Sequence, residues 1–380
     1  MSMEAEYCCP RCKGTLISLT DSYHCPACRA HYPIILGIPD FRVFPDRYID
    51  IVEDRRKAER IFERASISDF STLVDYYWSI TPDTPSEMAR RFSAQAVNAV
   101  ERGRHLLNVH STVKAKLEER GARVLDLGTR TGGLLMAAAE HGRRTIGIDI
   151  AFRWLIIARK RLEDANLPAM FACCCAEFLP FRNETFTLVV AENLLEHTAR
   201  QQQSIEEAHR VLKPDGVFFA TTWNRLTLAP EPHVRLWGIG WLPRKLAKRY
   251  VKFRKGVSYD YVRLLSLFEL RHLLRCTLFR RCEILLPTFS EAELANISSA
   301  QRLAVELYHR IKDWPLFREL LRIFGPVLHL VCVVFHKSVA TACAEILTKS
   351  RLSPETLHFI ATLLKRIEKT AATTLLNDFS

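Results

Sequence analysis

The chain has 380 residues, of which 48% are apolar and 25% are charged, and this length predicts two or three structural units. Only 14 glycines and 17 prolines are present, which excludes collagen-like and low-complexity classes. The formal net charge is +12, and residues 231–380 hold 24 basic but only 13 acidic side chains. A local basic excess of this kind indicates an anionic partner and says nothing about the fold.

The sequence shows no targeting or membrane-spanning signal. Residues 1–7 lack a charged and then apolar leader, and no window reaches the roughly 18 to 20 apolar residues of a membrane span. Twelve cysteines without a secretory signal favour metal binding or burial over disulfides. We therefore expect a cytoplasmic protein that is not secreted and has no transmembrane span.

Two cysteine pairs open the chain. Cys9 and Cys12 form the first C-x-x-C turn, Cys25 and Cys28 form the second, and twelve residues separate the pairs. Such turns direct four thiolates at one tetrahedral ion, and a closed four-sulfur set suits structural Zn²⁺. About forty residues bury little core, so the ion would supply the folding free energy. The alternative is four buried or redox-active cysteines without metal.

The segments around these cysteines carry a resemblance. They read C-P-R-C-K-G-T-L, C-P-A-C and H-Y-P-I-I-L-G-I-P-D-F. This text resembles the small zinc-ribbon family that includes the activator subunits of tRNA and protein methyltransferases. The resemblance implies a zinc-ribbon domain over residues 1–41 that does not itself bind a methyl donor.

Residues 42–120 predict a helical linker. The segments 47–64, 72–78 and 88–119 have helical patterns, and a breaker run T-P-D-T-P lies between the last two. The second segment holds the aromatic cluster Tyr76, Tyr77 and Trp78. This cluster predicts either core packing or a lid over a cofactor.

The middle of the chain has the pattern of a nucleotide-binding βαβ unit. Residues 124–127 form a short apolar strand, residues 128–133 a glycine-rich turn and residues 134–140 an apolar helix. A second strand over 144–150 brings Asp149 to its carboxyl end, where an acid can accept hydrogen bonds from ribose hydroxyls. Glycines in the turn allow the backbone to approach a ligand closely.

Further strands follow at regular spacing. They are predicted at 169–174, 182–190, 217–222, 282–286 and 327–335. Strands that alternate with helices predict a parallel sheet with helices on both faces. The series V-L-D-L-G-T-R-T-G-G, A-E-F-L-P-F and E-N-L-L-E-H resembles the class I S-adenosylmethionine-dependent methyltransferases. The resemblance implies an α/β fold with a Rossmann-like seven-stranded sheet over residues 121–337.

The same resemblance implies which residues surround the methyl donor. They are Asp126, Gly128, Gly132, Asp149, Ile150, Ala176, Glu177, Glu192 and Asn193. The first three would shape the turn and hold the amino-acid end, and Asp149 would hold the ribose. Ile150, Ala176 and Glu177 would surround the adenine, and the last two would lie beneath the sulfonium.

Two positions depart from the family pattern. Arg130 replaces the second glycine of the turn, and Cys175 replaces the acid that precedes Ala176. The arginine would crowd the donor or pair with its carboxylate, and the cysteine removes an acceptor for the adenine amino group. These departures raise the alternative of a non-catalytic scaffold that keeps the fold.

Methyl transfer from a sulfonium is an in-line displacement in which alignment does much of the work. A base helps when the acceptor is a hydroxyl or an amine. His197 follows the fourth strand and His233 opens the following insert. We predict these two as catalytic residues, and packing of His197 against the sheet is the alternative.

A basic insert over residues 229–263 follows the fifth strand. Trp237 and Trp241 precede a predicted amphipathic helix, residues 244–255, with an apolar stripe from Leu242 to Phe253. Three interpretations fit: an anionic membrane surface that holds a lipid-linked acceptor, RNA phosphate, or a solvated charged face.

The sequence thus predicts a methyltransferase that modifies oxygen, nitrogen or carbon of a small lipid- or glycan-type acceptor. The alternative is an rRNA or tRNA methyltransferase. Amino-methylating nucleic-acid enzymes carry an N-P-P-Y tetrad after the fourth strand, and A-E-N-L stands there in this chain, which argues against that subgroup. Residues 338–380 predict a helical tail that caps the sheet or mediates self-association.

Overall fold

The computed structural model describes residues 7–334 except 83, 280, 290–293 and 295–298. The first described unit is a four-stranded antiparallel sheet in the order β1-β2-β3-β4. Its strands are β1 (Ile17–Ser18), β2 (Ser22–His24), β3 (His31–Ile35) and β4 (Ile38–Pro39). The two C-x-x-C turns flank the first two strands.

This small sheet is joined to the large one through backbone pairing and aromatic packing. Tyr7 pairs with Phe181, and Asp40 pairs with Cys173 at the end of a strand of the large sheet. Phe41 is fully buried and packs against the ring of Tyr7, their centroids 4.9 Å apart. The N-terminal unit therefore shares a core with the domain that follows it.

Five helices form the linker: α1 (Ile51–Ala65), α2 (Phe70–Ser79), α3 (Ser86–Val97), α4 (Ala99–Val109) and α5 (Ser111–Glu118). Asp50 and Asp69 cap the first two by accepting hydrogen bonds from backbone N–H groups of the first turn. The stretch 88–119, which the sequence predicts as one helical segment, is divided into three helices at Asn98 and His110.

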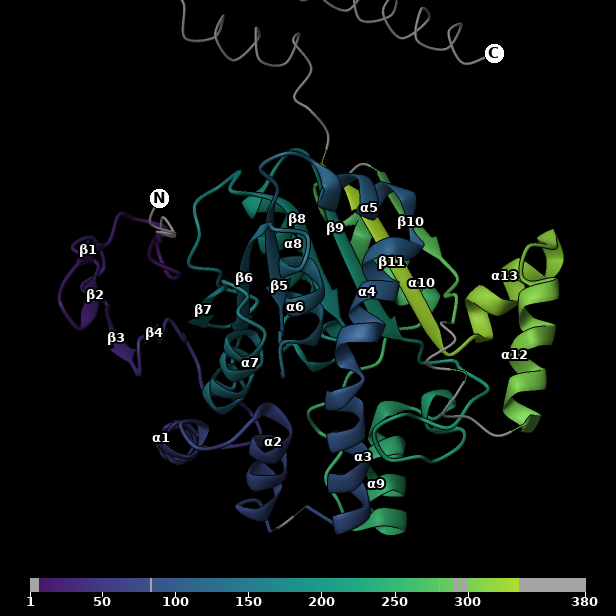
Figure 1. Cartoon of the computed structure of the whole chain (residues 1–380). Coiled ribbons are helices and arrows are strands. Elements are labelled where there is room, and N and C mark those ends of the chain that lie inside the picture. The colour runs from purple at the N-terminus through teal and green to yellow at the C-terminus, as the bar shows by residue number, and fades with distance from the viewer. Residues whose placement is uncertain (1–6, 83, 280, 290–293, 295–298, 335–380) are drawn as a thin grey trace, which may run out of the picture. The chain divides into compact units, whose positions relative to one another are not determined.

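The large sheet has seven strands in the order β10-β11-β9-β8-β5-β6-β7 (Figure 1). They are β5 (Arg123–Leu127), β6 (Arg144–Asp149), β7 (Met170–Cys173), β8 (Phe186–Glu192), β9 (Leu212–Trp223), β10 (Arg281–Leu285) and β11 (Val327–Val333). The central strands are parallel, and β11 runs antiparallel to both of its neighbours. The predicted seven-stranded Rossmann-like sheet is confirmed, with this one reversed strand.

Helices cover both faces of the sheet, as predicted. The side chains of β8 alternate between two cores, Val189 in one and Leu188 in the other. The core around Leu188 is closed by α4, α5 and α6 (Gly133–Ala139). The core around Val189 is closed by α8 (Gln201–Val211), α10 (Leu267–Arg275) and the N-terminal unit. A third core joins α7 (Phe152–Asp164) to α1 and α2.

The remaining elements lie around the insert and the last strands. They are η1 (Leu195–His197), η2 (Ile239–Trp241), α9 (Arg244–Lys255), α12 (Ser299–Ile311) and α13 (Pro315–Phe324). Among the described residues, no helix combines the length and apolar character that crossing a membrane requires. The predicted tail, residues 338–380, lies outside the described residues.

One cysteine pair departs from the expectation that metal binding or burial is favoured over disulfides. Cys282 on β10 and Cys332 on β11 are joined by a disulfide. The two residues are direct partners in the antiparallel register, which brings their Cα atoms to 4.1 Å. Cys173, Cys174 and Cys175 are buried free thiols, which fits the general expectation of burial for cysteines that bind no metal.

Candidate functional site

The glycine-rich turn after β5 has the backbone that a close ligand approach requires. Gly128 and Gly132 adopt φ values of 71° and 76°, and Arg130 also lies in the left-handed region at φ 49°. This left-handed conformation explains why the family pattern has a glycine at the position of Arg130. The arginine keeps the turn intact, since its backbone N–H donates to Asp149 Oδ2 at 2.9 Å.

The helix after the turn lies unusually close to the linker. A Cβ added to Gly133 would be 2.3 Å from the Cβ of Ala99, and one added to Gly103 would be 2.8 Å from the Cα of Leu134. The two glycines therefore allow α4 to pack directly on α6. This contact brings a linker helix to the edge of the predicted donor site.

Two cavities meet at Gly128. The larger has a volume of about 200 Å³ and lies beside the turn and the linker helices. The smaller, about 80 Å³, lies at the ends of β6 and β7. Seven of the nine predicted donor residues line one or both: Asp126, Gly128, Asp149, Ile150, Ala176, Glu177 and Glu192.

Gly132 and Asn193 do not line either cavity. Gly132 precedes α6, and a Cβ there would lie 3.0 Å from that of Ala158, so it serves helix packing. The Asn193 amide oxygen accepts from Thr221 Oγ1 at 3.2 Å, and its backbone N–H donates to the Thr221 carbonyl. Their predicted donor contacts stay predictions.

The larger cavity contains both signs of charge. Asp126 and Glu192 line it together with Arg102 of α4, and Arg102 Nε donates to Glu192 Oε1. The amino-acid end of a methyl donor is a zwitterion, which such a set can hold with an acid on the ammonium and the arginine on the carboxylate. Sequence reasoning missed Arg102, because nothing in its helix distinguishes it from the other linker arginines.

The aromatic cluster of the linker borders the same cavity. Trp78 lines it with Phe92 and Trp154, and the rings of Trp78 and Phe92 are stacked with centroids 5.5 Å apart. Tyr77 is instead buried in the core of α1, α2 and α7. Tyr77 thus has the core-packing role, one of the two that the sequence left open, and the alternative of a lid over a cofactor stays a prediction for Trp78.

Burial shifts the acids of the site toward their neutral forms. Asp126 is buried, which raises its pKa to about 7 despite a hydrogen bond from Thr129 Oγ1 at 2.7 Å, and the charges of Glu192 and Asp149 raise it further. Burial also raises the pKa of Asp149 to about 6, against hydrogen bonds from the backbone N–H groups of Ala151 and Arg130. A bound cation would favour ionisation of both.

The smaller cavity takes part of its wall from the linker. Phe44, Asp46, Arg47 and Tyr48 line it opposite Asp149 and Ile150, and sequence reasoning missed all four. Cys175 does not line it, and its thiol lies 3.5 Å from the Phe44 carbonyl. The cysteine therefore contacts the linker where the family pattern has an acid for the donor.

Glu177 lines the smaller cavity but is already engaged. Its Oε1 accepts the backbone N–H groups of Ala199 and Arg200 at 2.7 and 3.3 Å. These bonds cap the start of α8, because the N–H groups before a helix lack intrahelical acceptors. The predicted role beside the adenine would fall to the other carboxylate oxygen, Oε2 of Glu177.

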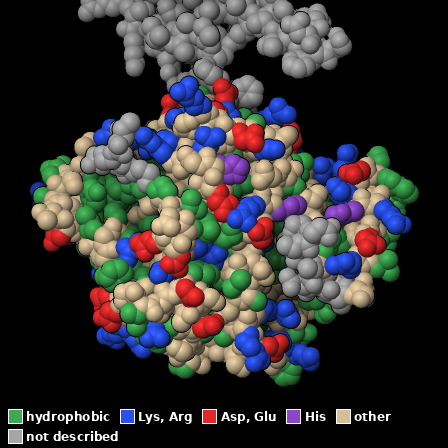
Figure 2. All heavy atoms as spheres, in the orientation of Figure 1, with side chains coloured by type: hydrophobic (Ala, Val, Ile, Leu, Met, Phe, Trp, Pro, Cys, Tyr) green, Lys and Arg blue, Asp and Glu red, His purple; other side chains and the backbone are tan. Residues whose placement is uncertain are grey.

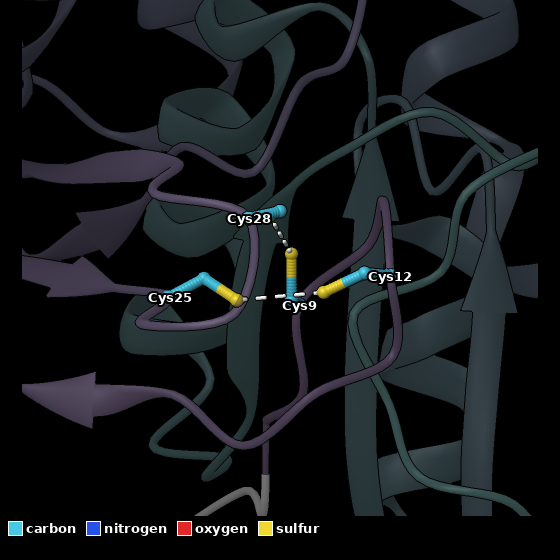
Figure 3. A group of neighbouring side chains, drawn as sticks. All are labelled: Cys9, Cys12, Cys25 and Cys28. Carbon is cyan, nitrogen blue, oxygen red and sulfur yellow. Dashed lines mark hydrogen bonds between the residues drawn. The ribbon is translucent and has the colours of Figure 1, made fainter.

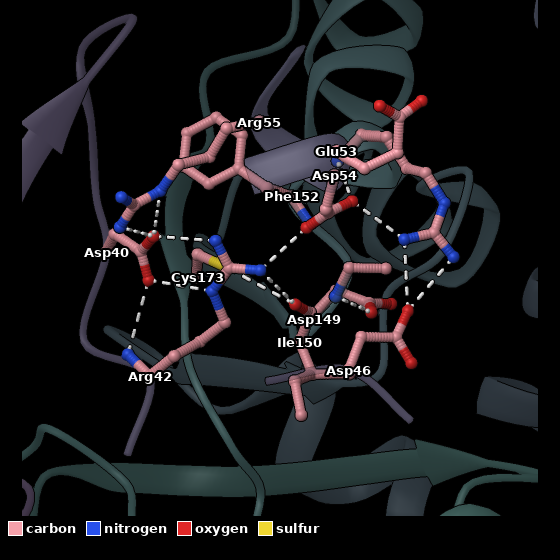
Figure 4. A network of polar contacts seen from close by, with 12 residues as sticks. Asp40, Arg42, Asp46, Glu53, Asp54, Arg55, Asp149, Ile150, Phe152 and Cys173 are labelled. Carbon is pink, nitrogen blue, oxygen red and sulfur yellow. Dashed lines mark hydrogen bonds and ion pairs between the residues drawn. The ribbon is translucent and has the colours of Figure 1, made fainter. Parts of the chain in front are cut away.

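A buried ion network ties the linker to the donor site (Figure 4). Asp54 accepts from Arg42 Nη1 at 2.6 Å, from Arg153 Nη1 at 2.7 Å and from the Phe152 backbone N–H at 2.9 Å. Arg42 also donates to the Ile150 carbonyl at 3.2 Å. Asp54 thus fixes the start of α7, directly after the strand end that carries Asp149.

The network extends in both directions from Asp54. Arg42 donates to Asp40 at 2.7 Å, next to the N-terminal unit, and Arg153 donates to Asp46, a wall residue of the smaller cavity, at 3.0 Å. The side chains are almost fully buried, with exposed fractions of 8% or less. Removing one partner of such a pair would leave a buried charge uncompensated.

The two predicted catalytic histidines meet although 36 positions separate them. His197 Nε2 lies 3.2 Å from His233 Nε2, and His197 Nδ1 lies 3.1 Å from the Tyr48 hydroxyl. His233 Nδ1 lies 2.5 Å from Glu231 Oε1. Burial, and then the charge of His233, lower the pKa of His197 to about 3, so its imidazole is neutral.

The four cysteines of the N-terminal turns converge (Figure 3). Their sulfur atoms all lie within 4.8 Å of one another, with Cys9 to Cys28 at 3.5 Å and Cys12 to Cys25 at 3.4 Å. Sulfurs bound tetrahedrally about 2.3 Å from Zn²⁺ would be about 3.8 Å apart. The donor set and its spacing therefore fit a structural zinc ion.

The basic insert presents charges and apolar side chains together. Ala247 and Val251 face the core of the insert, whereas Leu246 and Phe253 are exposed, so the predicted stripe from Leu242 to Phe253 is divided between two faces. Figure 2 shows basic side chains spread over the visible face, with acidic ones between them. The charge excess therefore does not form one patch on that face.

Comparison with known proteins identifies the central domain. Residues 125–220 match the family model described as a methyltransferase domain. The ubiquinone biosynthesis O-methyltransferase of Methylobacterium sp. (strain 4-46) is 32% identical over 130 residues, 33% of this chain and 51% of that protein. The enzyme of the same name from Agrobacterium fabrum is 24% identical over 193 residues, 49% of this chain and 74% of that protein.

Solved structures also align with the chain. Phosphoethanolamine N-methyltransferase 2 of Haemonchus contortus has a TM-score of 0.38 at 20% identity and covers 57% of this chain and 49% of its own. A complex of the Haloferax volcanii Trm112 methyltransferase activator with a methyltransferase has a TM-score of 0.39 at 20% identity, covering 64% and 97%.

These findings confirm the predicted resemblance to class I S-adenosylmethionine-dependent methyltransferases, and the chain carries a methyltransferase domain. The chain spans about half the length of the first curated relatives that it matches.

Proposed function

We propose that the protein transfers a methyl group from S-adenosylmethionine to an oxygen atom of a small acceptor. The observation that carries the proposal is the pair of cavities that meet at Gly128, one lined by Asp126, Glu192 and Arg102 and the other by Asp149. The amino-acid end of the donor would occupy the larger cavity and the adenosine the smaller. The turn at Gly128 would then lie beside the sulfonium.

The chemistry needs little beyond alignment. In-line attack by the acceptor oxygen breaks the bond between methyl carbon and sulfur, and the sulfur leaves with the electron pair as S-adenosylhomocysteine. Glu192 and Asp126 would hold the ammonium group, Arg102 the carboxylate and Asp149 the ribose. His197 and His233 stay the predicted bases for the acceptor's proton. His197 lines the smaller cavity, so the acceptor would enter beside the adenosine.

The proposed acceptor is lipid- or glycan-type and is presented at an anionic membrane surface. Four large side chains of the insert support this, with exposed fractions of 66% for Trp237, 49% for Trp241, 49% for Leu246 and 86% for Phe253. Leu246 and Phe253 belong to the basic helix α9, and Trp237 and Trp241 precede it. Exposed aromatic and apolar side chains next to lysines and arginines bind anionic interfaces. A cytoplasmic location beside such a membrane stays a prediction from the sequence.

We also propose a structural zinc ion on Cys9, Cys12, Cys25 and Cys28. The spacing of their sulfurs supports it. When bound, the ion would hold the two turns of the N-terminal unit together. That unit packs against the sheet through Phe41 and Phe181, so zinc would stabilise the donor site indirectly and take no part in the reaction.

Calorimetric titration of the zinc-loaded full chain with S-adenosylhomocysteine tests the donor site. We expect micromolar binding that weakens at least tenfold in Asp149→Asn, whereas Glu163→Gln, an exposed acid of α7, leaves it unchanged. Absence of heat at millimolar ligand would refute the proposal and favour the non-catalytic scaffold. Equal affinity of the Asp149→Asn variant would refute the assigned cavity.

Sedimentation with vesicles tests the acceptor side. We expect the chain to bind phosphatidylcholine vesicles containing phosphatidylglycerol, and the triple charge reversal of Lys248, Arg249 and Lys252 to glutamate to abolish binding while donor affinity persists. Failure to bind these vesicles would refute the membrane surface. Co-purifying RNA that is released steeply with salt would favour the RNA methyltransferase instead.

A further inference from the structure

A second cluster of potential metal ligands lies next to the donor site. One carboxylate oxygen of Glu196 and one ring nitrogen each of His197 and His233 lie within 4.8 Å of one another. Glu196 and His197 belong to η1, which follows β8, and His233 belongs to the insert after β9. The cluster therefore joins an element of the donor site to the element proposed to meet the acceptor.

The two imidazoles are held by partners at their outer nitrogens. Glu231 is 2% exposed, and its carboxylate lies 2.5 Å from His233 Nδ1 while also accepting from the His233 and Val234 backbone N–H groups, both at 2.8 Å. The Tyr259 hydroxyl donates to it at 3.0 Å. This fixes the proton of neutral His233 on Nδ1 and leaves a lone pair on Nε2, the arrangement that second-shell carboxylates impose on metal-binding histidines.

The facing nitrogens have the spacing of two ligands. His197 Nε2 and His233 Nε2 are 3.2 Å apart, and two nitrogens about 2.1 Å from a tetrahedral ion would be about 3.4 Å apart. In the chain without an ion, His197 can donate its Nε2 proton to His233 while Tyr48 donates to His197 Nδ1. An ion would replace that proton, and His197 would then donate from Nδ1 to Tyr48.

Glu196 supplies the independent observation. It is fully buried, its Oε2 accepts from Thr222 Oγ1 at 2.9 Å, and its Oε1 is buried without a hydrogen-bond partner. An unpaired buried carboxylate oxygen is costly. Among the described residues, the side chains that hydrogen-bond to Glu196 and Glu231 are Thr222, Tyr259 and His233, and Arg91 acts on Glu231 through its charge alone.

We propose that Glu196, His197 and His233 bind a divalent first-row transition ion of the zinc class that holds the acceptor hydroxyl. Two imidazoles and one carboxylate leave a coordination position open for a substrate oxygen. This inference rests on the proposed methyl transfer and refines it: with the ion bound, the imidazoles are ligands rather than proton acceptors. It commits the acceptor to an oxygen nucleophile, because a hard hydroxyl suits such an ion.

The step balances as follows for the acceptor R–OH. Coordination lowers the pKa of the hydroxyl, and its proton leaves to water. The oxygen lone pair forms the O–CH₃ bond, and the S–CH₃ bond breaks with its electrons on sulfur. The products are R–OCH₃, S-adenosylhomocysteine and one proton, and nothing is oxidised or reduced.

Metal content of the full chain tests the site. After equilibrium dialysis against Zn²⁺ and gel filtration, we expect two zinc ions per chain, one of them in the cysteine site. Glu196→Gln, which keeps the shape of the side chain, and His233→Ala should each retain one ion, as should the variant with Cys25 and Cys28 changed to serine. His272→Ala, an exposed histidine of α10, should retain two.

Co²⁺ distinguishes the two sites by spectrum. The thiolate charge-transfer band reports on the cysteine site. The chain with Cys25 and Cys28 changed to serine should therefore lack this band but keep visible d–d bands from the second site. Adding Glu196→Gln to that variant should remove the d–d bands. One ion per chain in the wild type, or cobalt spectra unchanged by Glu196→Gln, would overturn the inference.

Parallel titration with S-adenosylhomocysteine separates this inference from the proposed function. Donor binding with only one zinc ion per chain would refute the second metal site, leave methyl transfer standing and return both imidazoles to the role of proton acceptors. Two zinc ions without donor binding would refute the methyltransferase proposal and keep the metal site.

Discussion

Replacing Asp54 by asparagine tests whether the linker is part of the donor site. The side chain is fully buried and joins two arginines, Arg42 and Arg153, to the start of α7. Asparagine keeps the size and one acceptor oxygen but removes the charge. Both guanidinium groups then stay buried, each with a single remaining carboxylate partner, Asp40 or Asp46.

The size of the effect follows from this burial. Removing one partner of a buried pair costs about 3–5 kcal/mol, and we expect the low end, about 3 kcal/mol, because the remaining carboxylates compensate in part. That is a large share of a total stability of about 5–15 kcal/mol. Donor affinity should also fall about tenfold, because Arg42 donates to Ile150 and Arg153 to Asp46, both in the wall of the smaller cavity.

Urea denaturation of the zinc-loaded chain measures the first effect and calorimetry with S-adenosylhomocysteine the second. Glu53→Gln is the matched control, since Glu53 precedes Asp54 on α1 and forms an exposed pair with Arg56 at 3.1 Å, whose loss costs about 1 kcal/mol or less. If Asp54→Asn and Glu53→Gln change the free energy of unfolding by amounts within about 1 kcal/mol of each other, the network does not contribute the stability proposed for it. Unchanged donor affinity at lowered stability would refute the link to the donor site.

Three further predictions concern the turn, its acids and the zinc. In Gly133→Ala the new Cβ would lie 2.3 Å from that of Ala99, so overpacking should lower the free energy of unfolding by at least about 1–3 kcal/mol and weaken donor binding. Adding Ala99→Gly should recover part of the stability and part of the affinity. A Gly133→Ala variant as stable as wild type would disprove the close contact. Because burial raises the pKa of Asp126 to about 7, the stability that its protonated carboxyl contributes to the ligand-free fold should be lost as pH rises from about 4 to 7, measured as the difference between wild type and Asp126→Asn. Affinity for the cationic S-adenosylmethionine should rise from pH 6 to 8, and an identical rise in Asp126→Asn would exclude this carboxyl as the cause. Cys25→Ser should lower bound zinc and the midpoint of thermal unfolding, and zinc content equal to wild type would rule out the cysteine site.

The sequence predicted the large sheet well because its strands are encoded locally. Short apolar runs such as residues 124–127 and the acid-tipped strand ending at Asp149 appear in the structure close to the expected positions. The cysteine cluster could likewise be anticipated, because two C-x-x-C turns restrict where four thiols can point. One prediction failed for the opposite reason: the Cys282–Cys332 disulfide depends on which strands become neighbours.

What the sequence by itself determined is therefore the order of strands, turns and motifs, since hydrophobic period and glycine position act within a few residues. Tertiary structure alone decided which distant groups converge. It brought Arg102 and Tyr48 of the linker to the cavities and set His233 against His197. Packing of α4 on α6 and of the insert beside η1 places these side chains, and no local pattern in the sequence records such contacts.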